Sequence, residues 1–354
     1  MKRAVKPSYK TFLDNAAIAE LLAVESEHAE YPVSKALRRA SRRAFVWPEE
    51  ATEIIHAGRS LTELRAVGPY LEKLIRTWIV DPPDLPKTPP IRKNFLTLPQ
   101  ARRILQRDPS WLRDLKGDLQ MHTFWSDGLG STLEMAEAAM ERGYEYIAIT
   151  DHSKGLKIAN GLDEQRLAQQ GQEIGDLNES FRSRNKRLRV VRSIEVNLNP
   201  RGEVDMGQSS LRQLDVVLGS FHSSLRKKED QTARYLAALR NQNIHILGHP
   251  RGRIYNFRLG LNAEWTRVFE VAAELDKAVE IDAYPDRQDV SLDLLRIAKA
   301  AGCRISIGTD AHHPSDLGFI ELGLAAAMKA GIKRERILNF LSTEQLLDWA
   351  CKHA

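Results

Sequence analysis

The sequence is poor in cysteine, because Cys303 and Cys351 are the only two among its 354 residues. Neither belongs to a CxxC pair, so a disulfide framework, a thiolate metal site and a redox motif are not indicated. No run reaches the roughly 18 uninterrupted apolar residues that a bilayer-spanning helix requires. The first residues, MKRAVKPSYK, lead into no apolar stretch like that of a signal peptide. We therefore expect a cytoplasmic protein with reduced thiols and no membrane contact.

Charge is distributed unevenly along the chain. Residues 1–113 contain 20 Lys and Arg against 13 Asp and Glu, an excess of seven, whereas the remaining residues contain 32 against 34. Such a split is typical of a polyanion-binding module attached to a part whose chemistry needs carboxylates, although many basic surfaces bind nothing.

The first part of the chain is predicted to be a small all-α domain, which we place at residues 1–82. Apolar positions recur at helical spacing in four stretches between residues 12 and 78. Six prolines then fall between Val80 and Pro99, and because proline removes backbone donors and favours extended geometry, we expect a linker here. Together with a lead-in helix in LPQARRILQRDPSWLRDL, this linker covers residues 83–114.

From residue 115 to 354, seven short strand-like runs alternate with amphipathic helical segments. The runs are 115–123, 144–152, 188–198, 214–224, 244–250, 278–285 and 303–313. This alternation favours repeated βα units and a parallel sheet. Polar residues end nearly all the runs, which favours a closed barrel over an open sheet, since the C-terminal strand ends of such a barrel form one active-site face. We predict an α/β fold, a (βα)7 barrel preceded by the all-α domain.

The predicted strand ends carry many histidines and carboxylates. With one amide, they are Gln120, His122, Asp127, His152, Glu195, His222, His249, Asp310 and His312. A single histidine at a strand end is more often structural than a ligand, but here five histidines occupy five strand ends. On a shared face their side chains converge, and imidazole together with carboxylate suits Zn2+, Mn2+ or Fe2+.

This ligand set predicts phosphoester hydrolysis. Two or three divalent ions about 3.5 to 4 Å apart can clamp the attacking and leaving oxygens, lower the pKa of a bridging water and neutralise phosphate charge. Glu195 is the best candidate for a bridging carboxylate, and we expect catalysis to depend most on Asp127, Glu195, His249 and Asp310. No Ser/His/Asp relay competes, and GHPRGR and GLGS lack the GxxxxGK[ST] spacing of a P-loop.

At these residues the chain resembles the polymerase and histidinol phosphatase (PHP) family. DLQMHTFWSDG resembles the first motif, ITDHS the second, GSFHSS with GHP the third and GTDAHH the fourth, while IEVN supplies an intervening acidic ligand. The resemblance implies a (βα)7 barrel with a trinuclear site. The implied ligands are Gln120, His122, Glu195 and Asp310 for the first ion, Glu195, His222 and His249 for the second, and Asp127, His152 and His312 for the third.

One position departs from the family pattern, since many members have histidine in place of Gln120. An amide oxygen is a weaker ligand than imidazole, so we expect the first site to bind loosely or to prefer Mn2+ over Zn2+. The form DLQxH is similar to the PHP domain that follows bacterial family X DNA polymerases, in which the first helices form a small DNA-binding domain. No nucleotidyl-transfer domain lies between the two parts here, so we expect no polymerase activity.

Residues 61–75, LTELRAVGPYLEKLI, are similar to the helix-hairpin-helix of that branch. Its turn glycine, Gly68, would present backbone N–H groups at a helix N-terminus to DNA phosphates, without sequence preference. Ala66 replaces the first glycine of the usual GxG, and the alternative is an ordinary αα-hairpin with a glycine turn.

Basic residues beside the ligands are candidates for phosphate binding, because arginine can grip phosphate bidentately. They are Lys154, Arg226, Arg251, Arg253 and Arg287. We predict a metal-dependent phosphoesterase that acts on DNA ends or gaps in DNA repair, as a 3′-5′ exonuclease or a 3′-phosphatase. Two alternatives remain: a small-molecule phosphatase of the histidinol-phosphatase or nucleotide type, and a non-catalytic DNA-binding protein with a structural metal site.

Overall fold

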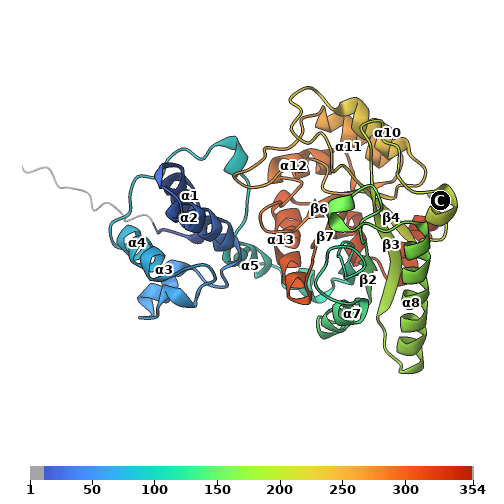
Figure 1. Cartoon of the computed structure of the whole chain (residues 1–354), viewed down its shortest axis with the longest axis horizontal. Coiled ribbons are helices and arrows are strands. Elements are labelled where there is room, and N and C mark those ends of the chain that lie inside the picture. Colours follow the sequence, from blue (N-terminus) through green and yellow to red (C-terminus); the bar gives the residue numbers. More distant parts are fainter. Residues whose placement is uncertain (1–11, 353–354) are drawn as a thin grey trace, which may run out of the picture. The chain divides into compact units, whose positions relative to one another are not determined.

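The structure, a computed structural model, describes residues 12–352 and divides into two compact units, Met1–Gln100 and Ala101–Ala354 (Figure 1). The first eleven residues of the predicted helical domain and the last two of the predicted barrel lie outside the described residues. Among the helices of residues 12–352, none is both long and apolar enough to cross a bilayer.

The N-terminal unit is built from helices, as predicted. They are α1 (Asn15–His28), α2 (Val33–Arg43), α3 (Ala51–His56) and α4 (Pro69–Val80), with short 3-10 helices η1 (Ala44–Val46), η2 (Leu61–Glu63) and η3 (Pro90–Arg92). Their apolar positions meet in a small core, in which the side chains of Ile18, Leu22, Leu37 and Ile75 are fully buried.

The proline-rich segment packs on this helical unit over part of its length. Arg92 of η3 is buried, and its guanidinium forms ion pairs with Glu20 at 2.9 Å and with Glu27 at 2.7 Å. The division between the two units falls within α5 (Leu98–Leu105). Residues 83–100, which we predicted to belong to a separate linker, therefore group with the helical unit, because a buried ion pair ties them to it.

The C-terminal unit is a barrel of seven parallel strands, and it confirms the predicted architecture. The strands are β1 (Gly117–Asp118), β2 (Tyr146–Ile149), β3 (Arg189–Asn197), β4 (Val216–Ser220), β5 (Ile246–Leu247), β6 (Ala278–Asp282) and β7 (Arg304–Gly308). Each strand pairs with the next in chain order. Just beyond β1 and β7, Asp310 N donates to Gln120 O at 3.0 Å and His122 N donates to Ala311 O at 2.8 Å, which closes the sheet on itself.

Helices surround the sheet, and all of them except α6, which precedes β1, follow a strand (Figure 1). They are α6 (Ser110–Arg113), α7 (Thr132–Glu141), α8 (Glu164–Ser183), α9 (Gln208–Leu211), α10 (Thr232–Arg240), α11 (Trp265–Glu274), α12 (Leu292–Ala300), α13 (Ile320–Ala330) and α14 (Thr343–Cys351), with η4 (Lys157–Ala159), η5 (Pro314–Phe319), η6 (Arg334–Arg336) and η7 (Leu338–Phe340). α7 begins with a capping box between Ser131 and Glu134. Because apolar helix faces cover the strands, all the strand positions of β2, β4 and β6 are buried.

The N-terminal end of the barrel is filled by η7 and α14. The Asn339 side-chain nitrogen donates to Gly117 O at 2.9 Å, and the Tyr146 hydroxyl donates to Leu338 O at 3.0 Å. Apolar residues of α14 lie in the same core cluster as Tyr146. The polar residues of the sequence motifs therefore gather at the opposite end, where the strands end.

Candidate metal centre

The predicted ligands lie at the C-terminal ends of the strands and in the loops that follow. In chain order these are His122 and Asp127 after β1, His152 after β2, Glu195 on β3, His222 after β4, His249 after β5, and Asp310 and His312 after β7. Because the strands are parallel around a closed barrel, these ends share one face. The Glu195 side chain is fully buried and that of Asp310 is 1% exposed, so the centre lies below the protein surface.

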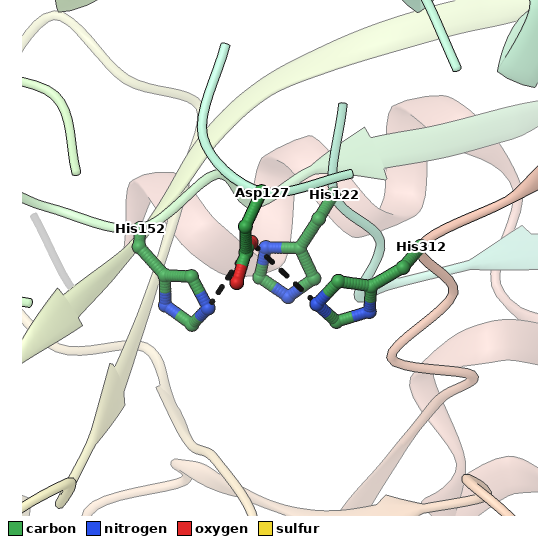
Figure 2. Close-up of side chains that lie close together, drawn as sticks. All are labelled: His122, Asp127, His152 and His312. Carbon is green, nitrogen blue, oxygen red and sulfur yellow. Dashed lines mark ion pairs between the residues drawn. The ribbon is translucent and has the colours of Figure 1, made fainter. Parts of the chain in front are cut away.

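Four of the predicted ligands form a first cluster. The ligand atoms of His122, Asp127, His152 and His312 all lie within 4.8 Å of one another. Figure 2 shows the three imidazole rings gathered around the Asp127 carboxylate, whose Oδ1 lies 3.7 Å from His152 Nε2 and 3.5 Å from His312 Nε2. Two atoms that are each about 2.1 Å from one tetrahedral ion lie about 3.4 Å apart. These separations therefore suit ligands that share a cation.

Glu195 forms the middle of a second cluster, in which its ligand atoms lie within 4.8 Å of those of His152 and His222. Its Oε1 lies 2.7 Å from His249 Nε2 and 3.2 Å from His222 Nε2. Its Oε2 lies 3.0 Å from His152 Nδ1 and 3.6 Å from His122 Nε2. Each carboxylate oxygen thus faces two imidazoles, which is the arrangement expected of a carboxylate shared between cations.

Asp310 connects the first cluster to a half-buried arginine, Arg287. Its Oδ1 lies 2.9 Å from His122 Nε2, and its Oδ2 lies 2.5 Å from Arg287 Nη1. The same Arg287 nitrogen lies 3.8 Å from Asp282 Oδ2. Asp310 has a φ of 51°, in the left-handed region that non-glycine residues seldom adopt, and such conformations concentrate at functional sites.

The charges of the centre shift the pKa values of its groups. Burial acts to raise the pKa of the Glu195 carboxyl, but His152 and the neighbouring imidazoles hold it well below its usual range. At Asp127 burial also acts to raise the pKa, but the hydrogen bond to His312 and the nearby imidazoles lower it to about 2. Burial likewise acts to lower the pKa of His312, but Asp127 and Asp310 raise it to about 9. The carboxylates are therefore ionised and ready to bind cations.

Several buried polar atoms of the centre form no hydrogen bonds with one another and are free to bind a metal ion. Among residues 12–352, His122 Nδ1, His152 Nδ1 and Glu195 Oε2 have no hydrogen-bond partner. His152 Nδ1 lies 3.0 Å from Glu195 Oε2, yet the pair lacks hydrogen-bond geometry. Buried polar atoms are costly when unsatisfied, and a mixture of imidazole and carboxylate suits Zn2+, Mn2+ or Fe2+. The residues present therefore fit divalent metal ions.

Neighbouring groups orient two of the imidazoles. His312 Nδ1 lies 2.7 Å from Asp310 O, and His222 Nδ1 lies 3.2 Å from Asn197 Oδ1. In each ring Nδ1 can donate to these oxygens, which leaves the Nε2 lone pair directed at the cluster. Asn197 is held in turn, because its backbone nitrogen donates to Ser153 Oγ at 2.8 Å.

Gln120 is placed differently from the other predicted ligands. In the amide orientation that satisfies both groups, its side-chain nitrogen donates to the Glu280 carboxylate at 2.7 and 3.0 Å. Glu280 is fully buried and also accepts a hydrogen bond from His249 N at 2.8 Å. The amide of Gln120 thus supports a buried carboxylate beneath the centre, and its role as a ligand of the first ion stays a prediction.

Sequence reasoning missed Glu280, Asp282 and Asn197. The first two alternate along β6 in AVEIDAYP, and both are fully buried. Two acidic residues in one apolar run are themselves a signal, because an unpaired buried carboxylate is costly and so requires partners nearby. Asn197 was hidden in the motif IEVN, two residues after Glu195 and therefore on the same side of β3.

Two of the predicted phosphate-binding residues form contacts with other parts of the protein. Arg253 is buried, and its guanidinium donates to Arg287 O at 2.9 Å and to Gln288 O at 2.6 Å. It therefore holds the loop after β6, and its role as a substrate contact stays a prediction. Lys154 lies 2.6 Å from Glu164 at the start of α8.

The other three basic candidates differ in their surroundings. The Arg226 guanidinium lies 4.7 Å from the centroid of the exposed Phe257 ring. Arg251 is half-buried, and its Nε donates to Leu261 O at 3.3 Å. Arg287 is closest to the predicted ligands, through its contact with Asp310. We keep these three as candidates for binding phosphate.

The predicted helix-hairpin-helix lies in the helical unit. Its first helix is the single turn η2, and its second is α4, for which Gly68 is the N-cap. Ala66 has a φ of 70°, which explains why glycine is usual at this position. Pro69 occupies the first position of α4 and has no N–H, so any anion at this terminus would bind the amides that follow it.

Comparison with known proteins agrees with this geometry. Residues 118–309 match the PHP domain family, which is more than half of the chain. The chain is 38% identical over 236 residues to the "DNA polymerase/3′-5′ exonuclease PolX" of Bacillus subtilis (strain 168), covering 66% of this chain but 41% of that protein. It is 28% identical over 234 residues to a probable phosphatase of Thermoanaerobacter sp. (strain X514), covering 63% of this chain and 89% of that protein. The match thus spans less than half the length of the B. subtilis protein.

Among solved structures, histidinol phosphate phosphatase from Lactococcus lactis, complexed with zinc, L-histidinol and phosphate, matches with a TM-score of 0.45 and 21% identity, over 62% of this chain and 94% of that chain. On the family match, the chain belongs to the PHP domain family. The class defined by its fold and site is a metal-dependent phosphoesterase.

Proposed function

We propose that this phosphoesterase acts on DNA ends, as a 3′-5′ exonuclease, a 3′-phosphatase or both. The observation that carries the chemistry is the position of Glu195, with two imidazoles facing each of its oxygens and the first cluster beside it. Similarity to a protein named as a polymerase and 3′-5′ exonuclease supports a DNA substrate. The excess of positive charge in residues 1–113 supports the same substrate, because positive charge attracts the phosphate backbone.

We assign the nine predicted residues, from Gln120 to His312, as the groups that would hold two or three divalent ions. When bound, such ions activate water and stabilise the negative charge that develops on phosphorus oxygens. The protein itself orients two of these ligands, His222 through Asn197 and His312 through the Asp310 carbonyl. Arg287 can rotate from Asp310 toward an incoming phosphate, while Arg226 and Arg251 neutralise the strand at the rim.

A small-molecule phosphatase is the second candidate. The observation that favours it is the similarity to probable phosphatases, which extends over 89% of the length of one of them. That protein is matched nearly whole, whereas the B. subtilis relative is not. In this case the helical unit would have another role, such as oligomerisation.

The test uses full-length protein with Mn2+ or Zn2+ and a 5′-labelled duplex that ends in a 3′-hydroxyl or a 3′-phosphate. A shortening ladder indicates an exonuclease, and one mobility shift on the phosphorylated end alone indicates a 3′-phosphatase. His312→Gln should abolish the product, whereas His313→Gln, the adjacent exposed histidine, should not. Absence of any DNA product, with hydrolysis of a small phosphomonoester retained, would reject DNA ends as the substrate and favour the second candidate.

A further inference from the structure

A groove on the outside of the barrel is strongly basic. It lies between α8, the first half of β3 and α14, and has a volume of about 440 Å³. Five of its lining residues are cationic, namely Arg182, Lys186, Arg187, Arg189 and Arg192. Figure 1 shows α8 and β3 next to each other, and the segment that joins them carries two of these cations, Lys186 and Arg187.

The charge comes from one short stretch of sequence. Residues 182–192, RSRNKRLRVVR, contain six Lys and Arg and no Asp or Glu. In the whole chain 52 of 354 residues are Lys or Arg, so this stretch is several times more basic than the rest. Like charges at this density repel one another, which disfavours the fold unless anions compensate them.

The protein supplies little compensation. Asp215 lies 3.1 Å from the Arg192 guanidinium and 3.8 Å from that of Arg189, so this carboxylate serves two arginines. Glu344 is the second acidic residue of the lining, against five cations. Within the part of the chain that the structure describes, the side chains of Arg182, Lys186 and Arg187 form no ion pair or hydrogen bond. All three are exposed. A helix dipole accounts for a cation such as Arg182 in the last turn of α8, but not for those beyond the helix.

The groove is also hollow along α8. Gly171 and Gly175 face it one turn apart, and a Cβ atom at either position would meet nothing within 4 Å. A glycine within a helix costs about 1 kcal/mol relative to alanine, and no packing contact requires one here. The missing side chains leave the floor of the groove open to a ligand.

The groove is remote from the metal centre. β3 begins at Arg189, beside the groove, and reaches Glu195 six residues later. A strand rises about 3.3 Å per residue, so Arg189 lies about 20 Å from Glu195, and Arg192, which also lines the groove, lies about 10 Å from it. The groove therefore cannot bind the phosphate that reacts.

We propose that this groove binds the phosphodiester backbone of a nucleic acid strand, away from the end that is hydrolysed. The proposal rests on the proposed function for its choice of DNA as the strand. Arginine fits a phosphodiester through paired N–H groups, and the unpaired cations would exchange their counterions for strand phosphates. With the duplex spacing of about 3.4 Å between successive phosphates along the axis, a stacked strand would use about six nucleotides to extend from the metal centre to Arg189.

The test compares two triple variants of the full chain that remove the same charge. The groove variant is Arg182→Gln, Lys186→Gln and Arg187→Gln. The control variant is Arg212→Gln, Arg240→Gln and Lys329→Gln, at exposed positions outside the groove. Affinity for a fluorescent 20-nucleotide single strand with phosphorothioate linkages is measured by anisotropy on metal-loaded protein over a range of salt concentrations, and thermal melting checks that both variants fold.

In the groove variant we expect the slope of log K against log salt to fall by about 2, since each lost contact with a single strand contributes about 0.7. The control variant should keep the wild-type slope. Equal slopes in all three proteins would overturn the proposal, and so would equal losses in both variants. A groove that binds only inorganic phosphate, a free nucleotide or an acidic peptide, with strand affinity unchanged in the groove variant, would also overturn it.

The two proposals fail separately. If wild-type protein hydrolyses no DNA end but the groove variant binds the strand more weakly than wild type does, the proposed function is wrong and the proposal for the groove is supported. If wild-type protein degrades DNA ends while the groove variant binds the strand as wild type does, the groove alone is rejected.

Discussion

Asp118 on β1 accepts two hydrogen bonds from Thr309, the residue that follows β7. The hydroxyl of Thr309 donates to Asp118 Oδ2 at 2.5 Å and its backbone nitrogen donates to Oδ1 at 3.1 Å. Both residues are fully buried. The pair spans the seam where the barrel closes, and it fixes the backbone immediately before Asp310.

Thr309→Val removes the hydroxyl donor with almost no change in volume. A buried carboxylate that loses a hydrogen bond costs about 1–3 kcal/mol, so we expect the free energy of unfolding in urea to fall by that amount. Metal affinity should fall as well, because Asp310 loses its support. Thr266→Val, at an exposed position of α11, serves as the control and should change neither quantity. Wild-type stability in Thr309→Val would contradict this account of the seam.

Glu195→Gln keeps the shape of the side chain and removes the charge that four imidazoles surround. We expect purified protein to hold at least one metal ion fewer per chain, measured by elemental analysis. We expect hydrolysis to fall more than about 100-fold, since even residues that only support metal ligands cost 10- to 100-fold. Glu270→Gln, exposed on α11, is the matched control. An unchanged metal content would show that Glu195 is not a ligand.

Metal affinity should rise with pH. The pKa of His312 in the metal-free protein is raised from 6.5 to about 9, so its imidazole is protonated at pH 7 and must lose a proton to bind a metal ion. Calorimetry in two buffers that differ in ionisation enthalpy should therefore detect proton release on metal binding. The same heat of binding in both buffers would argue against a protonated ligand.

The stability of the metal-free protein should fall as the pH rises. A folded pKa above the unfolded value contributes stability that is present below pH 6.5 and is lost as the pH rises through about 9. We expect the Tm of chelator-treated protein to decline over this interval. His312→Gln should weaken the decline, and His313→Gln should preserve it. A decline of equal size in His312→Gln would assign it to other groups.

Arg92→Ala should destabilise the helical unit. Removing one partner of a buried ion pair leaves Glu20 uncompensated and costs about 3–5 kcal/mol. Hydrogen exchange should therefore accelerate in α1 while the barrel strands keep their protection. Arg42→Ala, exposed on α2, is the control, and the prediction is wrong if both variants exchange alike.

The sequence alone determined the class of fold and the face that carries the site. Strands with polar ends that alternate with amphipathic helices can bury their apolar residues only in a parallel sheet, and closing that sheet brings all the strand ends together. His122, His152 and Glu195 could therefore be predicted to converge without coordinates. The family of the chain was also identified from its motifs, and the match of residues 118–309 to the PHP domain family confirms it.

Only the tertiary structure decided which partners these side chains meet. Gln120 lies against Glu280, Arg253 holds a loop, and Arg287 lies against Asp310. Each outcome depends on rotamers and on loops that connect residues far apart in sequence, which local patterns do not encode. Likewise, Arg92 reaches Glu20 across 72 residues, so burial of a charge decided where the proline-rich segment packs. The pattern of residues thus determines the barrel and the polar face at its C-terminal strand ends, and side-chain packing determines the contacts within that face.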